Sequence, residues 1–163
     1  MPEAGAVHIR PTRESDRSWM REEMRKWWGS ETVVVRGEKL YPAELGGYIA
    51  EKDEEKIGLI ILRIDENCCE ILSLTTAGDP PGIGKKLFTT ALTALRKKNI
   101  SRLSVVTTND NINALRFYQQ LGFVISDWRM NAVEFSRKLK KEIPQIGNYN
   151  IPIRDEIELE MTI

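Results

Sequence analysis

The sequence predicts an α+β fold with a mixed, mostly antiparallel central sheet flanked by helices, which some schemes class as a three-layer α/β fold. Three observations predict it: a strand precedes a helix near the start, three strands separated by polar turns follow, and two amphipathic helices then alternate with strands. Because 163 residues can bury a core without disulfides or metals, we expect a single domain spanning residues 1–163.

The first half of the chain predicts a strand, a helix and an antiparallel meander. Apolar and polar residues alternate over residues 6–12, which predicts a short strand. Residues 31–47 indicate a short β-rich stretch and a loop. Residues 47–77 contain three strands separated by the polar turns KDEEK and DENC. After the first strand, one apolar helical stripe ends at Gly29 and consists of Met20, Met24, Trp27 and Trp28.

Two helices separated by a strand follow the meander. Residues 82–99 carry one buried helical face, and residues 101–108 read as the next strand. Residues 109–122 begin with asparagine caps and end at Gly122, a residue type favoured just after a helix. The apolar face of the first helix repeats every four residues, at Ile83, Leu87, Ala91 and Leu95.

The last part of the chain predicts a strand, a helix, a loop and a strand. Residues 123–130 read as a strand, residues 132–142 as a short charged helix, and residues 144–155 as a loop rich in proline, glycine and asparagine. Residues 156–163 alternate apolar residues with glutamates, as a strand with one dry face does. At a sheet edge such a regular strand could pair with a second copy in a homodimer, although its three glutamates oppose this.

The composition excludes several classes of protein. Lysine and arginine number 24, as do aspartate and glutamate, so no net charge draws the chain to nucleic acid or to an anionic membrane. Cys68 and Cys69 are adjacent, which an ordinary disulfide does not suit, and His8 is the only histidine. The start lacks the apolar run of a signal peptide, and no stretch is long enough to cross a bilayer. We therefore expect a soluble cytoplasmic protein without a metal site.

Two short motifs carry the strongest functional signal. The segment GIGKKLF opens a helix after the meander, and the segment NINALRFYQQLGF follows one β-α unit later. In this order and on these elements, the motifs resemble the GNAT superfamily of acyl-CoA-dependent N-acetyltransferases over residues 70–125. Gly82 and Gly84 match the first family motif, with Asp79 where the family usually has Gln or Arg. The second motif is matched by Asn111, Ala114, Tyr118, Gly122 and Phe123.

The resemblance implies acetyl-CoA as the cosubstrate. In the family, backbone N–H groups of this loop and of the first helical turn bind the coenzyme A pyrophosphate, because unpaired amides and the helix dipole favour an anion. Pro80 and Pro81 have no N–H to offer, and Asp79 lowers the local positive charge. A plain helix N-terminus that packs close to a strand also explains the glycines. The residues implied in phosphate binding are Gly82, Ile83, Gly84, Lys85 and Lys86.

For the transfer itself, the resemblance implies an acid, a carbonyl-binding amide and a strand beside the pantetheine arm. Tyr118 takes the place of the tyrosine that protonates the departing thiolate; the alternative is a core tyrosine with a hydrogen-bonded hydroxyl. Leu72 and Leu74 lie on the strand that runs beside the pantetheine, and Leu74 is the expected amide donor to the acetyl carbonyl. Asn111 corresponds to an asparagine that contacts the cofactor, or it caps its helix.

The general base is the least defined part of the site. A base is needed because a lysine or α-amino group is mostly protonated at neutral pH. Glu70 begins the same strand, and strict alternation puts its side chain on the face of Leu72 and Leu74, towards the acceptor. A solvated carboxylate at a strand end is the alternative for Glu70. A base acting through water is also open, with Glu31, Tyr41 and Glu44 as candidates, and so is an amine that arrives already deprotonated.

We therefore expect an N-acetyltransferase that moves an acetyl group from acetyl-CoA to a primary amine by direct attack in a ternary complex. The alternative is a degenerate relative that binds an acyl-CoA or a protein partner without catalysis. Aromatic side chains with one arginine suit an amine that carries a carboxylate or belongs to a peptide. The acceptor is expected between residues 144–152 and the side chains Trp27, Trp28, Arg36 and Tyr41, although core packing also explains the two tryptophans.

Overall fold

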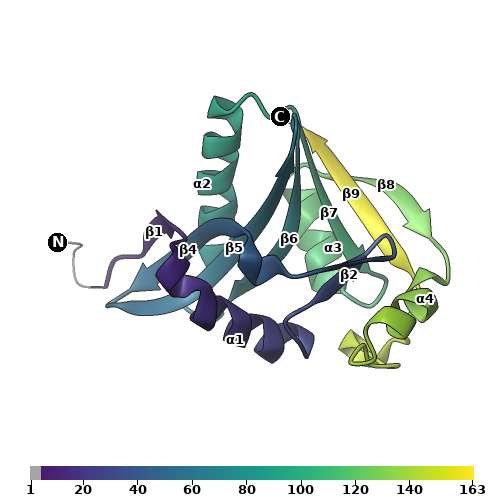
Figure 1. Ribbon diagram of the computed structural model, residues 1–163. Helices are drawn as coiled ribbons and strands as arrows, with labels where there is room; N and C mark the ends of the chain where they lie inside the picture. Colours follow the sequence, from purple (N-terminus) through teal and green to yellow (C-terminus); the bar gives the residue numbers. More distant parts are fainter. Residues whose placement is uncertain (1–4) are drawn as a thin grey trace.

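Figure 1 shows the protein as a computed structural model, which describes residues 5–163. The expected domain also includes residues 1–4, which lie outside the described residues. Within the described chain, seven strands form one sheet in the order β1-β4-β5-β6-β7-β9-β8, and β2 and β3 form a separate hairpin. The strands are β1 His8–Pro11, β2 Val33–Val35, β3 Glu38–Leu40, β4 Gly46–Lys52, β5 Glu55–Asp65, β6 Cys68–Thr76, β7 Arg102–Thr108, β8 Val124–Arg129 and β9 Glu156–Thr162. The helices are α1 Arg17–Trp28, α2 Ile83–Lys97, α3 Ile112–Gln120 and α4 Ala132–Leu139.

This architecture confirms the expected α+β fold with a mixed, mostly antiparallel sheet flanked by helices. β4, β5 and β6 form the antiparallel meander, and β6 pairs with β7 in parallel through the crossover helix α2. The expectation that the last strand forms a sheet edge is wrong, because β9 lies between β7 and β8 and pairs antiparallel with both. Among residues 5–163, no helix combines the length and the apolar character needed to cross a membrane.

Helices cover both faces of the sheet (Figure 1). α2 and α3 pack on one face, around a core that includes Leu95 and Ile157. α1 packs on the other face, where Met20 and Met24 contact the residues Ile49, Leu59 and Ile61 of β4 and β5. The predicted four-residue repeat of α2 is confirmed, since it is buried at Ile83, Leu87, Ala91 and Leu95.

The apolar stripe expected on α1 is only half buried. Met20 and Met24 are fully buried, whereas Trp27 and Trp28 are 45 and 37 % exposed. Trp28 reaches the sheet through one polar contact, in which its Nε1 donates a hydrogen bond to Ser73 Oγ at 3.1 Å. Core packing therefore does not account for the two tryptophans at the end of this helix.

The sheet opens between β6 and β7. Residues 68–71 pair with residues 102–105, and beyond them β6 pairs only with β5 and β7 only with β9. A β-bulge lies where the two strands part: Ile71 and Ser73 pair with adjacent residues of β5, which leaves Leu72 unpaired. A bulge bends its strand and increases the local twist. In Figure 1, the strands fan apart from a common end near the C-terminus.

A buried ion-pair network joins the start of α1 to the sheet. Asp16 is 2 % exposed and accepts hydrogen bonds from Arg10 Nη1 and Nη2 at 2.8 and 2.9 Å. Lys56 Nζ of β5 lies 3.1 Å from the same carboxylate, and the backbone N–H of Arg13 donates to it at 2.7 Å. The hydrogen bonds from Arg10, opposed by burial, hold the pKa of Asp16 well below its usual range.

We expect Asp16→Asn to destabilise the protein by about 3 kcal/mol at neutral pH, because it removes the buried carboxylate that pairs with Arg10 and Lys56, although Arg10 keeps its second partner Glu51. Since the folded-state pKa of Asp16 is lowered, its stabilising contribution is present above its unfolded pKa of about 4 and is lost as the pH falls further. Urea unfolding of both proteins at pH 7 and at pH 3 measures the difference. A difference in the free energy of unfolding that stays constant with pH would contradict this role.

Candidate functional site

The N-terminus of α2 presents backbone amides without acceptors. Gly82 has a φ of +86°, a left-handed conformation that favours glycine, and its carbonyl accepts the first helical hydrogen bond from Lys86 N at 3.1 Å. The N–H groups of Ile83, Gly84 and Lys85 have no hydrogen-bond acceptor among the described residues. Unpaired amides and the helix dipole together favour an anion at this end of α2.

The space beside Gly82 at this helix end is open. A Cβ built on Gly82 would meet no atom within 4 Å, and one built on Gly84 would lie 3.5 Å from the ring of Phe117, an ordinary contact. Lys85 and Lys86 are exposed and add positive charge beside the amides. The arrangement therefore fits a phosphate-bearing ligand, as the sequence predicts for this segment.

The bulge in β6 breaks the alternation expected along this strand. Leu72 packs in the core on the α1 side, whereas Leu74 packs against the core on the α2 side. Glu70 lies between Cys69 and Ile71, which both belong to the α2-side core, so its own side chain faces the α1 side. The expectation that Glu70, Leu72 and Leu74 share a face is wrong for Leu74, because the unpaired Leu72 shifts the alternation by one residue.

Tyr118 is buried on α3 with an unbonded hydroxyl. It is 5 % exposed, and its ring packs edge-on against the rings of Phe117 and Phe123, with centroids 5.1 and 5.3 Å away. Its hydroxyl forms no hydrogen bond with any of residues 5–163, which differs from the core tyrosine with a bonded hydroxyl that was the alternative. Burial raises the pKa of Tyr118 above its usual value, so the hydroxyl keeps its proton at neutral pH.

Asn111 caps α3. Its Oδ1 accepts a hydrogen bond from the backbone N–H of Ala114 at 3.2 Å, which confirms the capping role. The same residue also lines a large cavity beside the open ends of β6 and β7. A contact between Asn111 and a cofactor stays a prediction.

This cavity has a volume of about 560 Å³ and lies on the α1 side of the opening. Its walls come from the end of α1, from β2, from α4 and from the loop that precedes β9. Trp27 and Trp28 line it as expected, whereas Arg36 and Tyr41 do not. Four lining residues belong to the segments of β6 and β7 beyond their mutual pairing: Leu72, Val106, Thr107 and Thr108. We refer to it below as the acceptor cavity.

The side chains expected to act as a base lie outside the acceptor cavity. Glu70 is 7 % exposed, so it is not a solvated carboxylate, and its Oε2 lies 2.6 Å from Arg36 Nη2. Arg36 also donates from Nε to Glu158 Oε1 at 2.8 Å. The ion pair thus holds both Glu70 and Arg36 against the sheet. The other three candidates, Glu31, Tyr41 and Glu44, do not line the cavity either.

Three buried charged side chains that the sequence patterns do not single out line the acceptor cavity: Asp110, Lys140 and Glu156. Glu156 Oε1 accepts hydrogen bonds from Arg129 Nε at 2.6 Å and from the backbone N–H of Arg36 at 3.2 Å. Asp110 Oδ2 accepts from the backbone N and the Nδ2 of Asn148, each at 2.9 Å. The last contact ties the loop before β9 to the end of β7.

The burial of Glu156 corrects the expectation for the last strand. Alternation predicts one dry face and one glutamate face, yet Glu156 and Glu158 are only 4 and 8 % exposed. Arg36 and Arg129 cover them and pair with them from other parts of the chain. Glutamates that alternate with apolar residues give the same sequence pattern whether they are solvated or buried in ion pairs. The sequence therefore does not distinguish the two cases.

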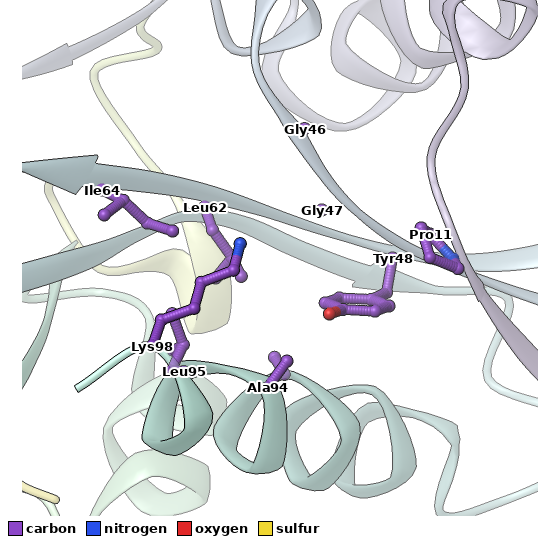
Figure 2. A pocket seen from close by; sticks show the side chains of 10 residues that line it. Pro11, Gly46, Gly47, Tyr48, Leu62, Ile64, Ala94, Leu95 and Lys98 are labelled. Carbon is purple, nitrogen blue, oxygen red and sulfur yellow. The ribbon is translucent and has the colours of Figure 1, made fainter. Parts of the chain in front are cut away.

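Figure 2 shows a second, smaller cavity of about 280 Å³ on the α2 side of the sheet. Ala94, Leu95 and Lys98 near the C-terminus of α2 face Tyr48 of β4 across it. None of the site residues predicted from the sequence lines this cavity. In the described part of the chain, no group of three or more His, Cys, Asp and Glu residues is placed to hold a metal ion.

Comparison with known proteins identifies the family. A model described as the acetyltransferase (GNAT) family matches residues 10–123, which is well over half of the chain. The chain belongs to the GNAT family. This confirms the resemblance carried by the two sequence motifs, and it makes acyl transfer the activity of the family to which the site belongs.

Relatives and solved structures match almost the full chain. The uncharacterized protein YxbD of Bacillus subtilis (strain 168) is 39 % identical over 154 residues, or 94 % of this chain and 97 % of that protein. The solved IAA acetyltransferase of Bacillus cereus ATCC 14579 has a TM-score of 0.71 at 22 % identity and covers 97 % of this chain and 100 % of its own. A GNAT acetyltransferase of Elizabethkingia anophelis with acetyl-CoA bound has a TM-score of 0.67 at 24 % identity, over 96 % of this chain and 98 % of its own. Both structures share the GNAT fold.

Proposed function

We propose that this GNAT protein transfers an acetyl group from acetyl-CoA to a primary amine, by direct attack of the amine on the thioester in a ternary complex. One observation carries the proposal: the sheet opens between β6 and β7, with the unpaired amides of α2 on one face and the acceptor cavity on the other. A thioester in this opening is accessible to an amine in the cavity. The acetyl-CoA-bound relative from Elizabethkingia anophelis supports the same cosubstrate.

The groups of this chain fit the parts of acetyl-CoA in order. The amides of Ile83, Gly84 and Lys85 suit the pyrophosphate, and the lysines of the first turn of α2 add positive charge. The end of β6 lies beside this turn, since a Cβ on Gly84 would be 3.8 Å from Thr76 Cγ2. The backbone of residues 72–76 has no strand partner towards the opening. Its N–H and C=O groups suit the amides of the pantetheine arm and, at Leu74, the thioester carbonyl.

Tyr118 is the acid that we propose for the departing coenzyme A thiolate. Its hydroxyl has no hydrogen-bond partner in the described chain, so it is free to bond to the sulfur. Its raised pKa keeps it protonated at neutral pH. The ring packing against Phe117 and Phe123 holds the side chain in one orientation. The step moves one proton from Oη to the sulfur, and the attacking nitrogen loses its second proton to solvent as the amide forms. The tyrosine regains a proton from solvent before the next turnover.

Glu156 is the base that we propose in place of Glu70. It is the buried carboxylate of β9 that lines the acceptor cavity, and it lies opposite Thr108 in the β7–β9 register. Both glutamates are paired with an arginine, but Glu70 lies outside the cavity. Glu156 therefore takes the proton that the acceptor's ammonium group must lose before its nitrogen attacks.

Tyr118→Phe is expected to lower kcat by about 100-fold or more, the usual contribution of a general acid, with little change in the Kd of acetyl-CoA. Release of coenzyme A thiol in the presence of a panel of primary amines measures kcat, and isothermal titration with acetyl-CoA measures Kd. Tyr149→Phe is the control, because Tyr149 is exposed and outside the cavity. An unchanged kcat would remove Tyr118 from the mechanism. Binding of acetyl-CoA without turnover of any amine would favour a non-catalytic acyl-CoA-binding protein.

Gly84→Ala is expected to raise the Kd of acetyl-CoA about tenfold, equivalent to about 1.4 kcal/mol, because the added methyl group stands beside the phosphate-binding amides. The fold should tolerate it, since the Cβ makes only an ordinary contact with Phe117. Isothermal titration measures the affinity and thermal unfolding checks the fold. Thr89→Ala, about one turn further along α2, is the matched control. Equal affinities in both variants would place the pyrophosphate elsewhere.

Glu156→Gln is expected to lower kcat/KM by about 100-fold, because an amide cannot accept the proton of the ammonium group. Glu158→Gln is a matched control, since Glu158 lies on the same strand and contacts the same two arginines but does not line the cavity. Steady-state kinetics with one accepted amine compares the two variants, and their melting temperatures show whether both disturb the arginines to a similar extent. Equal losses of kcat/KM would assign Glu156 to structure alone.

A further inference from the structure

Lys140 is a buried cation that faces the acceptor cavity without a carboxylate partner. It lies just after α4, is 5 % exposed and lines the cavity. Its Nζ donates a hydrogen bond to the backbone carbonyl of Thr32 at 2.6 Å. Lys140 forms no ion pair with any of residues 5–163. Its ammonium group has three donors, and this hydrogen bond uses one of them on a neutral acceptor.

Most other buried charges among residues 5–163 have a partner of opposite sign, whereas Asp110 is held by hydrogen bonds from Thr108 and Asn148. Asp155 is paired with Arg154, and Glu156 with Arg129. A buried charge without such a partner is costly, because the protein interior replaces its hydration poorly. Burial lowers the pKa of Lys140; the nearby Glu142 opposes this effect and Lys39 adds to it. A bound anion at this position would remove the cost.

The acceptor cavity has opposite charges at the two ends of β2. Thr32, which precedes β2, is the residue that Lys140 contacts. Arg36, which follows β2, donates its backbone N–H to Glu156. Between these ends the walls include the apolar residues Val33, Val34, Val35, Val133, Ile143 and Ile153, and the acidic residues Asp110 and Glu142 also line the cavity. The cavity thus matches a molecule with a cationic end, an apolar middle and an anionic end.

We propose that Lys140 binds a carboxylate of the acceptor, so that the acceptors are amines carrying a carboxylate on an apolar frame. This inference rests on the proposed acetyl transfer and names its substrate class. The acceptor's amino group lies towards Glu156 and the opening of the sheet, and its carboxylate lies against Nζ of Lys140. The arginine that the sequence suggested for such a carboxylate, Arg36, is already paired with Glu70 and Glu158.

The test compares each amine acid with its amide, and rates are referred to the concentration of free amine because amidation also lowers the pKa of a neighbouring amino group. The probes are L-leucine, L-leucyl-L-leucine and 6-aminohexanoate, each beside its primary amide, and kcat/KM is measured for both members of each pair. We expect the wild-type protein to prefer at least one acid over its amide by about 30-fold or more, the usual effect of a desolvated charge pair. Lys140→Met should abolish that preference. Lys141→Met is the matched control, since Lys141 is exposed, and it should retain the preference.

Two outcomes overturn the inference: amides that are acetylated as well as their acids in every pair, or an acid preference that survives in Lys140→Met. The fold of the variant is checked by thermal unfolding. Its melting temperature should equal or exceed that of the wild type, because methionine keeps the length of the side chain and removes an unpaired buried charge. The ratio of acid to amide is insensitive to a general loss of structure, which lowers both rates together.

Binding measured without turnover separates this inference from the proposed function. N-acetyl-L-leucyl-L-leucine and its C-terminal amide are titrated into the protein, with the Lys140→Met and Lys141→Met variants alongside. Binding of the acid alone, lost only in Lys140→Met, supports the carboxylate site even if no amine is acetylated. Equal binding of acid and amide, or binding of neither, overturns it even where acetyl-CoA binds and simple amines are acetylated.

Discussion

The short parallel pairing of β6 and β7 is the constraint on which the site depends. Only residues 68–71 and 102–105 are paired, and the bulge at Leu72 lies where the strands part. Parallel neighbours need a crossover connection, and α2 provides it, so α2 begins at the diverging end of β6. Three features therefore meet at one place: the unpaired edge of β6, the N-terminus of α2 with its free amides, and the acceptor cavity.

Charge pairing on the α1 side of the sheet builds the wall opposite this opening. Three buried glutamates of β6 and β9 meet two arginines, Arg36 after β2 and Arg129 of β8. These contacts hold the β2–β3 hairpin against strands that are distant in the sequence, and β2 then lines the acceptor cavity. Because the pairs occupy Arg36 and Arg129, Lys140 is the buried cation left to face the cavity.

Most of the fold follows from local patterns. The four-residue repeat of α2, the asparagine cap of α3 and the polar turns of the meander each depend on neighbours within a few residues, so they could be predicted correctly. The position of β9 between two strands could not be predicted, because an alternating segment is compatible with an edge strand and with an interior strand. The side of the sheet to which Leu74 points could not be predicted either, because one extra residue at the bulge reverses the alternation of side chains.

The sequence by itself determined the elements, the glycines that open α2, the tyrosine on α3 and the family, because these depend on periodicity and on motifs of adjacent residues. Only the tertiary structure decided which charges pair and which face the cavity. Lys140 contacts a carbonyl 108 positions away, and Arg36 contacts a glutamate 122 positions away. Strand order and one bulge set these contacts. A charged residue looks the same in the sequence whether it is buried in an ion pair or exposed, so the sequence pattern does not reveal its partner.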